Sequence, residues 1–214
     1  MYVGDALHST GQYFKRLIIT VRGIMEFVMT KTHVLTVEPM TEESFAGFGD
    51  LWYAREMPGD HRILFPTGYS HDGHSTVHVI WQPQEGRTFN ELERHFGVTQ
   101  SFIQLSGAPA VVCAALPTDL DDPNDIPAPG DVRAFLVDPE KGYSFKRGTW
   151  HSLNRHILKS PGATFLILNS SPNPTQLVNY ETGAGTLSRD LDVDPAPKSL
   201  EHAAASGIAF EIST

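Results

Sequence analysis

The chain has 214 residues, of which 40% are hydrophobic and 19% charged, and its acidic residues outnumber lysine and arginine by 25 to 16 for a formal charge of −9. This composition suits one folded domain and is too apolar for a disordered chain. An acidic surface repels phosphate groups, so nucleic acids and anionic membranes are not expected partners.

The first 28 residues are expected to form a peripheral N-terminal extension. The apolar run at 17–29 is interrupted by Arg22 and Glu26. It is too short to span a bilayer and is not followed by a small-residue cleavage site. We therefore expect the main barrel domain at 29–180. Residues 181–214 are rich in Gly, Ala, Ser and Asp without clear periodicity, and we expect a peripheral tail or an oligomer contact there.

Alternating apolar and polar residues, many of them β-branched, predict seven strands, at 33–38, 61–65, 75–82, 100–105, 110–116, 132–137 and 164–169. Most are separated by clusters of Gly, Pro, Asp or Asn, which are typical of turns. One early helix is predicted at 41–48, with Thr41 as its N-cap and two acidic residues in its first turn. Many short strands with few helices indicate an all-β sandwich or barrel.

Two further segments have structural rather than functional interpretations. Cys113 lies in the apolar run "APAVVCAAL", which favours a buried thiol over a nucleophile. A single cysteine cannot form an intramolecular disulfide, which fits a reducing compartment and a cytoplasmic location. The acidic, proline-rich stretch 117–131 is predicted to be a solvated loop, because Pro123 stands where a calcium-binding loop needs a ligand and the later glutamate is missing.

The stretch "ELERHFGVTQ" at 91–100 has the spacing of a known β-barrel motif. Gly86 is followed after six residues by Glu93, then by His95, by Gln100 and by a glycine at 107. This pattern resembles the first motif of the cupin family, with Glu in place of the first His and Gln in place of the family's Glu. The segment 142–156 is similar to the second motif, which ends in a glycine and a nearby histidine, here His151. The resemblance implies a cupin-like double-stranded β-barrel (jelly roll) whose two motifs direct polar side chains into the barrel mouth.

The chemistry of this set leaves alternatives open. On a strand, Glu93 and His95 face the same side, where His151 would meet them. Together with Gln100 they offer oxygen and imidazole ligands for a divalent metal ion. The same cluster can instead bind a small carboxylate substrate and move a proton, with Glu93, His95 and His151 as catalytic residues. The third interpretation is that Glu93 pairs with Arg94 or another surface cation and faces solvent.

A more specific resemblance covers about residues 33–170. The segments "TVEPMTEESFAGFGD", "ELERHFGVTQSFIQLSGAPAVV", "RAFLVDPEKGYSFKRGTWH" and "TFLILN" are similar, in this order, to the ureidoglycolate lyase family. The resemblance implies a cupin barrel, usually a homodimer, that cleaves ureidoglycolate to glyoxylate and urea in purine catabolism. The family commonly has Tyr-His where this chain has Phe145 and Lys146, and His-Pro where it has Ser152 and Leu153. These changes alter the hydrogen-bonding groups of the pocket wall.

Further polar residues are candidates for substrate binding. Arg147 or Lys146 can hold a carboxylate, and Gln100 and His78 are predicted to face the barrel interior. Trp150 is expected to pack in the barrel. The leading hypothesis is a cytoplasmic lyase that acts on ureidoglycolate or a related hydroxy-carboxylate by acid–base elimination. The alternatives are a metal-dependent cupin dioxygenase or isomerase acting on another small carboxylate, and a non-catalytic cupin that binds a small ligand.

Overall fold

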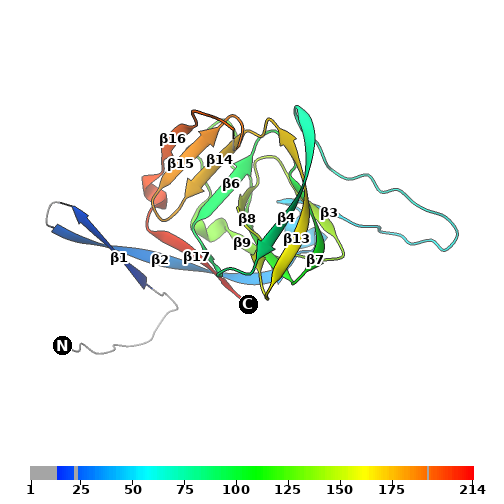
Figure 1. Ribbon diagram of the computed structural model, residues 1–214, viewed down its shortest axis with the longest axis horizontal. Helices are drawn as coiled ribbons and strands as arrows, with labels where there is room; N and C mark the ends of the chain where they lie inside the picture. The colour runs from blue at the N-terminus through cyan, green and yellow to red at the C-terminus, as the bar shows by residue number, and fades with distance from the viewer. Residues whose placement is uncertain (1–13, 22–23, 192) are drawn as a thin grey trace.

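The computed structural model describes residues 14–21, 24–191 and 193–214, and side chains from residue 30 onward except at 192 and 204. Within this part of the chain, hydrogen bonds join the strands into two sheets that curl around a common interior (Figure 1). The smaller sheet has the order β3-β10-β7-β13-β4. Its strands are β3 (Gly49–Trp52), β4 (His74–Pro83), β7 (Ser101–Gly107), β10 (Gly142–Phe145) and β13 (Gly162–Ser171).

The larger sheet has the order β16-β15-β14-β6-β11-β8-β9-β2-β17-β5, with β1 paired to β2 and β12 paired to β8. Its strands are β1 (Phe14–Val21), β2 (Ile24–Pro39), β5 (Thr88–Phe89), β6 (Glu91–His95), β8 (Ala110–Ala115), β9 (Arg133–Leu136), β11 (Trp150–Ser152), β12 (His156–Ile157), β14 (Thr175–Asn179), β15 (Ala184–Ser188), β16 (Lys198–Glu201) and β17 (Ile208–Ser213). The described helices are short: α1 (Glu42–Phe45) and 3-10 turns at Pro129–Asp131 and Ala203–Ala205. The expectation of an all-β, cupin-like fold is confirmed.

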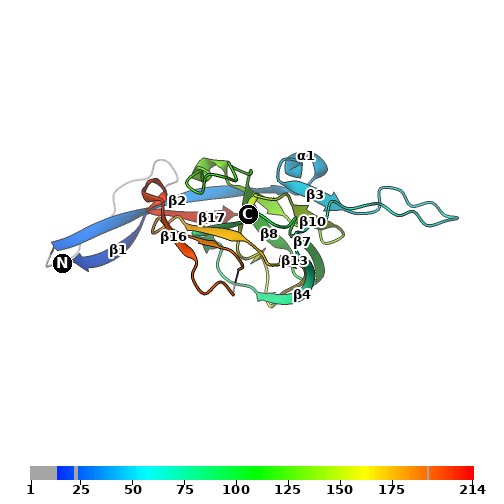
Figure 2. The same ribbon diagram turned by 90° about the horizontal axis from the view of Figure 1, so that it is seen from above.

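Six of the seven predicted strands overlap observed strands, namely β2, β4, β7, β8, β9 and β13, with ends that differ by at most one residue where the prediction runs past the strand. The predicted strand at 61–65 is wrong. This segment belongs to the long connection between β3 and β4, which projects away from the sheets (Figures 1 and 2). The side chain of Leu64 is 81% exposed there. β-branched and aromatic residues favour a strand only where a neighbouring strand can pair with it, and this segment has no such partner among the described residues.

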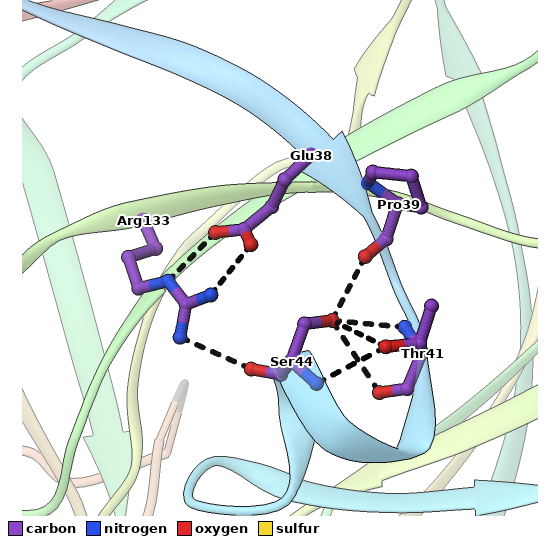
Figure 3. Close-up of polar contacts among 5 residues, drawn as sticks. All are labelled: Glu38, Pro39, Thr41, Ser44 and Arg133. Atoms are coloured by element: carbon purple, nitrogen blue, oxygen red, sulfur yellow. Dashed lines mark hydrogen bonds and ion pairs between the residues drawn. The ribbon is translucent and has the colours of Figure 1, made fainter.

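Side-chain hydrogen bonds hold the helix α1 against the larger sheet (Figure 3). The Thr41 hydroxyl accepts from the Ser44 backbone N–H at 3.1 Å, and the Ser44 hydroxyl accepts from the Thr41 N–H at 2.9 Å, which confirms Thr41 as the N-cap. Arg133 of β9 forms two parallel hydrogen bonds with Glu38 of β2, at 2.6 and 2.5 Å, and a third to the Ser44 carbonyl at 3.1 Å. One arginine therefore ties two parallel strands to the helix.

The strand β8 is buried on both faces, which explains its continuous apolar sequence. Val112 lies in a core cluster with Phe102, Phe135 and Phe145, on the side of the smaller sheet. Cys113 points the other way, into a second cluster with Trp150, Val178 and Phe210. Trp150 thus packs in the core. Burial raises the pKa of the Cys113 thiol well above its usual range, so this cysteine remains an uncharged core residue.

The first and the last described strands, β1 and β17, both pair with β2. The strand β1 pairs with the first half of β2 in a hairpin that projects from the sheets (Figures 1 and 2), whereas residues 1–13 and 22–23 of the expected extension lie outside the described residues. The segment 181–214, expected as a peripheral tail or oligomer contact, contributes β15, β16 and β17 to the larger sheet. The strand β17 runs parallel to β2, and its Phe210 and Ile212 are buried in the second cluster. This end of the chain therefore shares its core with the larger sheet.

A buried arginine anchors the acidic loop 117–131. The guanidinium of Arg94 contacts the rings of Trp150 and Phe96, at 4.6 and 5.0 Å from their centroids. Its guanidinium donates to the Gln176 side chain, to the Thr118 hydroxyl and to the backbone carbonyls of 119 and 122. The loop's aspartates are exposed, as expected for a solvated loop. Within the described residues, no helix has the length and apolarity needed to cross a membrane.

Candidate active site

Two neighbouring strands place Glu93, His95 and His151 side by side. Glu93 and His95 are alternate residues of β6 and face the same way. In the antiparallel pairing of β6 with β11, His151 stands directly opposite Glu93. One Glu93 carboxyl oxygen lies 3.8 Å from His95 Nε2 and 3.8 Å from His151 Nδ1, and all three side chains are buried. The third sequence interpretation, in which Glu93 faces solvent, is wrong.

The hydrogen bonds of Thr175 fix the tautomer of His95. Thr175 lies opposite His95 in the pairing of β14 with β6, and the His95 Nδ1 is 2.8 Å from its hydroxyl. That hydroxyl donates its one hydrogen to the Asn173 carbonyl at 2.9 Å, so it accepts the His95 Nδ1–H. The His95 Nε2 then carries a lone pair, and it is buried without a hydrogen-bond partner among the described residues.

His151 is held by stacking and by a backbone contact. Its ring lies on Phe145 of β10, with the centroids 4.5 Å apart and the planes 6° from parallel. The His151 Nδ1 is 3.2 Å from the Ser152 carbonyl, which is suited to accept an N–H from it. The His151 Nε2 is buried and makes no hydrogen bond within the described residues. Both histidines therefore present an unpaired Nε2.

Burial keeps both imidazoles uncharged near neutral pH. Burial, followed by the charge of Arg155, lowers the pKa of His95 to about 4. The side chains of Gln100 and Asn173 raise this pKa, but to a smaller extent. The pKa of His151 lies well below its usual value because of burial, then the neighbouring His95 and Arg155. A neutral imidazole is a proton acceptor and a metal ligand.

The interior around the cluster contains further polar atoms without partners. Gln100, a predicted site residue, is buried next to His95. Atoms of this region that are buried and make no hydrogen bond within the described residues are His95 Nε2, His151 Nε2, Gln100 Oε1, the Tyr143 hydroxyl and Arg155 Nε. Folded proteins leave few buried polar atoms unpaired, and a group of them in one interior indicates a binding site for a polar ligand.

Three predicted substrate-binding residues lie apart from this cluster. Lys146 is exposed, and its ammonium donates to the Ala46 carbonyl at 2.5 Å. Arg147 forms two hydrogen bonds with Asp72, at 2.9 and 3.1 Å. His78 is exposed on the edge strand β4. The strand β10 ends at Phe145, so the residues after it turn outward before β11 brings the chain back at Trp150.

Sequence reasoning missed Arg155, Tyr143 and Thr175. Arg155 follows His151 by four residues, in an irregular segment where no periodicity indicates which way a side chain points. Tyr143 lies two residues before Phe145 on β10, so strand alternation was the signal that places both on the inner face. Thr175 meets His95 only through the pairing of strands that lie 80 residues apart, and one sequence carries no signal for that pairing.

The fold and the cluster define a class: an all-β, cupin-like protein with a buried Glu–His–His group able to bind a metal ion or to transfer a proton. The three residues offer one ligand atom each, and these atoms lie within 4.8 Å of one another. The cluster comes from the part of the chain, residues 83–184, that matches the family model described as ureidoglycolate lyase.

Individual relatives agree with the family match. The chain is 33% identical over 132 residues to the ureidoglycolate lyase of Pseudomonas paraeruginosa, a match that covers 55% of this chain and 73% of the relative. It is 30% identical over 132 residues to the ureidoglycolate lyase of Rhodobacter capsulatus, with 56% and 76% covered. The protein belongs to the ureidoglycolate lyase family.

Proposed function

We propose that this protein is a cytoplasmic carbon–nitrogen lyase that cleaves ureidoglycolate to glyoxylate and urea. The observation that carries the proposal is the pair of buried imidazoles beside the carboxyl group of Glu93, each with an Nε2 that has no hydrogen-bond partner among the described residues. This arrangement lies in the segment matched by the family model, and the relatives at about one-third identity are named ureidoglycolate lyases.

The proposed reaction is an elimination that needs one proton to move from oxygen to nitrogen. A neutral Nε2 of His151 or His95 accepts the proton of the carbinol hydroxyl. The O–H electron pair forms the carbonyl of glyoxylate, and the carbon–nitrogen bond breaks with its electron pair going to the urea nitrogen. The imidazolium then gives its proton to that nitrogen, so no net proton is consumed. The low pKa makes the buried imidazolium a strong acid, which favours this second transfer, and makes the neutral imidazole a weak base in the first transfer.

Each member of the cluster has a separate role in this proposal. His151 is stacked on Phe145 and is the proposed acid–base group. His95 is fixed by Thr175 with its Nε2 toward the interior. The Glu93 carboxyl group stabilises the imidazolium formed during the reaction, since its oxygen is 3.8 Å from both rings. Gln100 orients the substrate through its unpaired side-chain oxygen, which can accept from a urea N–H.

The same residues fit a divalent metal ion. Glu93, His95 and His151 would hold it, with the Gln100 oxygen nearby, and two imidazoles with a carboxylate suit a borderline transition metal. A bound ion would supply Lewis-acid polarisation of a substrate oxygen. Elemental analysis of protein purified without chelator tests this proposal. The wild type is expected to retain bound metal, and His95→Ala is expected to retain less. An equal metal content in the two proteins would contradict the assignment.

A direct assay tests the proposed reaction. Purified protein incubated with ureidoglycolate is expected to release glyoxylate and urea in equal amounts, faster than buffer alone. A rate no higher than that of buffer would refute lyase activity on this substrate. Release of glyoxylate from another N-substituted hydroxyglycine, but not from ureidoglycolate, would assign the same elimination to a related substrate.

We further propose that the protein is a homodimer. Support comes from the outer face of β4, where the alternate side chains of Val77, Val79 and Trp81 are 61%, 65% and 53% exposed. A row of exposed apolar side chains on an edge strand is typical of an interface. Sedimentation equilibrium of the wild type is expected to give a mass near twice that of the 23.6 kDa chain. A monomer at micromolar concentration would contradict the proposal.

A further inference from the structure

Arg155 is a buried cation directed into the interior between the two sheets. The residue is only 4% exposed, and its guanidinium carbon lies 4.0 Å from the centroid of the Phe102 ring. Phe102 lies against Tyr143 and Phe145 in the inner core. Phe145 in turn stacks on His151. The guanidinium is therefore close to the catalytic cluster, on the side formed by the smaller sheet.

The segment that carries Arg155 is rigidly anchored. The buried side chain of Gln82 accepts from the Arg155 backbone N–H at 3.2 Å and donates to the Asn154 side chain at 3.0 Å. The Ser152 hydroxyl donates to the Asn154 carbonyl at 2.9 Å. These bonds hold the chain between β11 and β12, and they fix the direction in which the arginine enters the interior.

Within the part of the chain that the structure describes, the guanidinium donates one hydrogen bond to the protein. The contact of Nη2 with the Leu153 carbonyl is long, at 3.3 Å, and Nε is buried without a hydrogen-bond partner within the described residues. An arginine remains charged at all physiological pH values, and burying it costs free energy that an oxyanion held by two parallel hydrogen bonds can offset. Its charge also reaches the nearby ionisable groups, because it contributes to the lowered pKa values of both His95 and His151.

A surface cavity of about 340 Å³ borders this arginine. Its lining includes the acidic residues Glu85 and Glu91, and Arg155 is the only lysine or arginine among its described lining residues. Arg155 is thus the cationic residue of a cavity that also carries two carboxylates.

We propose that Arg155 holds the carboxylate of the bound substrate, with its guanidinium lying over the ring of Phe102. The inference rests on the proposed function for the identity of the substrate, but it requires only that the ligand be a small carboxylate. Held in this way, the carboxylate at one end of ureidoglycolate directs the carbinol carbon toward the two histidines. Arg155 thus takes the role that the sequence suggested for Lys146 or Arg147.

The test uses oxamate, a small carboxylate, and oxamide, in which an amide replaces the carboxylate. Isothermal titration with the full-length protein is expected to show that Arg155→Gln weakens oxamate binding by at least about 30-fold, as expected for loss of a charge-assisted bidentate pair. Arg155→Lys is expected to give an intermediate loss, because a point charge cannot form two parallel bonds. Oxamide binding should be equally weak in all variants. The exposed Arg87→Gln is the matched control and should bind oxamate like the wild type.

The outcomes separate this inference from the proposed function. If oxamate binding depends on Arg155 but ureidoglycolate releases no urea, the carboxylate site stands and the named reaction fails. If urea is released and Arg155→Gln leaves KM within about threefold of the wild type, the inference is overturned. If Arg155→Gln does not fold, Arg155→Lys and a crystal structure of the wild type with oxamate decide the matter. A carboxylate bound away from the guanidinium would then overturn the proposal.

Discussion

Replacing His156 by phenylalanine is expected to make the protein lose less stability when the pH is lowered. His156 lies in β12, next to Arg155, and is only 8% exposed. Its ring centroid is 5.0 Å from that of Phe89, and its Nε2 is buried without a partner within the described residues. Burial is the main cause that lowers the pKa of His156 to about 4, against a hydrogen bond to the Gly86 backbone.

The size of the effect follows from the difference between the folded and the unfolded pKa. An unfolded chain has a histidine pKa near 6.5, against about 4 in the fold. Between these values the unfolded chain binds a proton that the folded chain does not, so stability falls as the pH falls from 6.5 toward 4. From pH 7 to pH 4.5, proton linkage at this one site lowers the free energy of unfolding by about 2 kcal/mol.

Guanidinium chloride unfolding at pH 7 and pH 4.5 measures this difference. The wild type should lose about 2 kcal/mol more than His156→Phe, which keeps an aromatic ring against Phe89 but cannot be protonated. The exposed His74→Phe is the control and should keep the wild-type pH dependence. If the wild type and His156→Phe differ by less than about 0.5 kcal/mol, within extrapolation error, then His156 is accessible to protons in the folded protein and the argument fails.

Thr175→Val should lower kcat/KM by about 10- to 100-fold, because His95 loses the acceptor that fixes its tautomer; a loss under about threefold would show that the hydroxyl is dispensable. Deleting residues 1–28 should leave the melting temperature nearly unchanged, since β17 pairs with β2 from Lys31 onward; a drop of more than about 8 °C would contradict this. Arg94→Met should lower the free energy of unfolding by about 3 kcal/mol or more, because the 117–131 loop loses its anchor; an unchanged denaturation midpoint would be the contrary result.

The sequence predicted those parts of the site that follow from local periodicity. Glu93 and His95 share a face because they are two residues apart on a strand, and the motif spacing supplied His151 opposite them. The same reasoning placed most strands, but it also predicted one at 61–65, because apolar alternation does not reveal whether a partner strand exists.

The rest of the site depends on long-range structure. The sequence suggested Lys146 or Arg147 as the carboxylate-binding residue, yet both lie in the turn after β10, which continues through Gly148 with a φ of +79°. Arg155, four residues beyond His151, enters the interior because Gln82, 73 residues earlier, holds its backbone. Contacts of this kind depend on how distant strands pack, and a single chain does not encode them in any readable spacing.

The most direct test of the proposed function is the rate of urea release from ureidoglycolate by the wild type and by His151→Ala, compared at matched protein concentration. The account predicts that the wild type releases urea and glyoxylate in a one-to-one ratio, and that His151→Ala lowers kcat/KM by about 100- to 10,000-fold through loss of an acid–base group. The folded state of the variant is verified by circular dichroism. Urea release by the wild type no faster than in buffer, or a loss of less than about tenfold in a folded His151→Ala, would contradict the account.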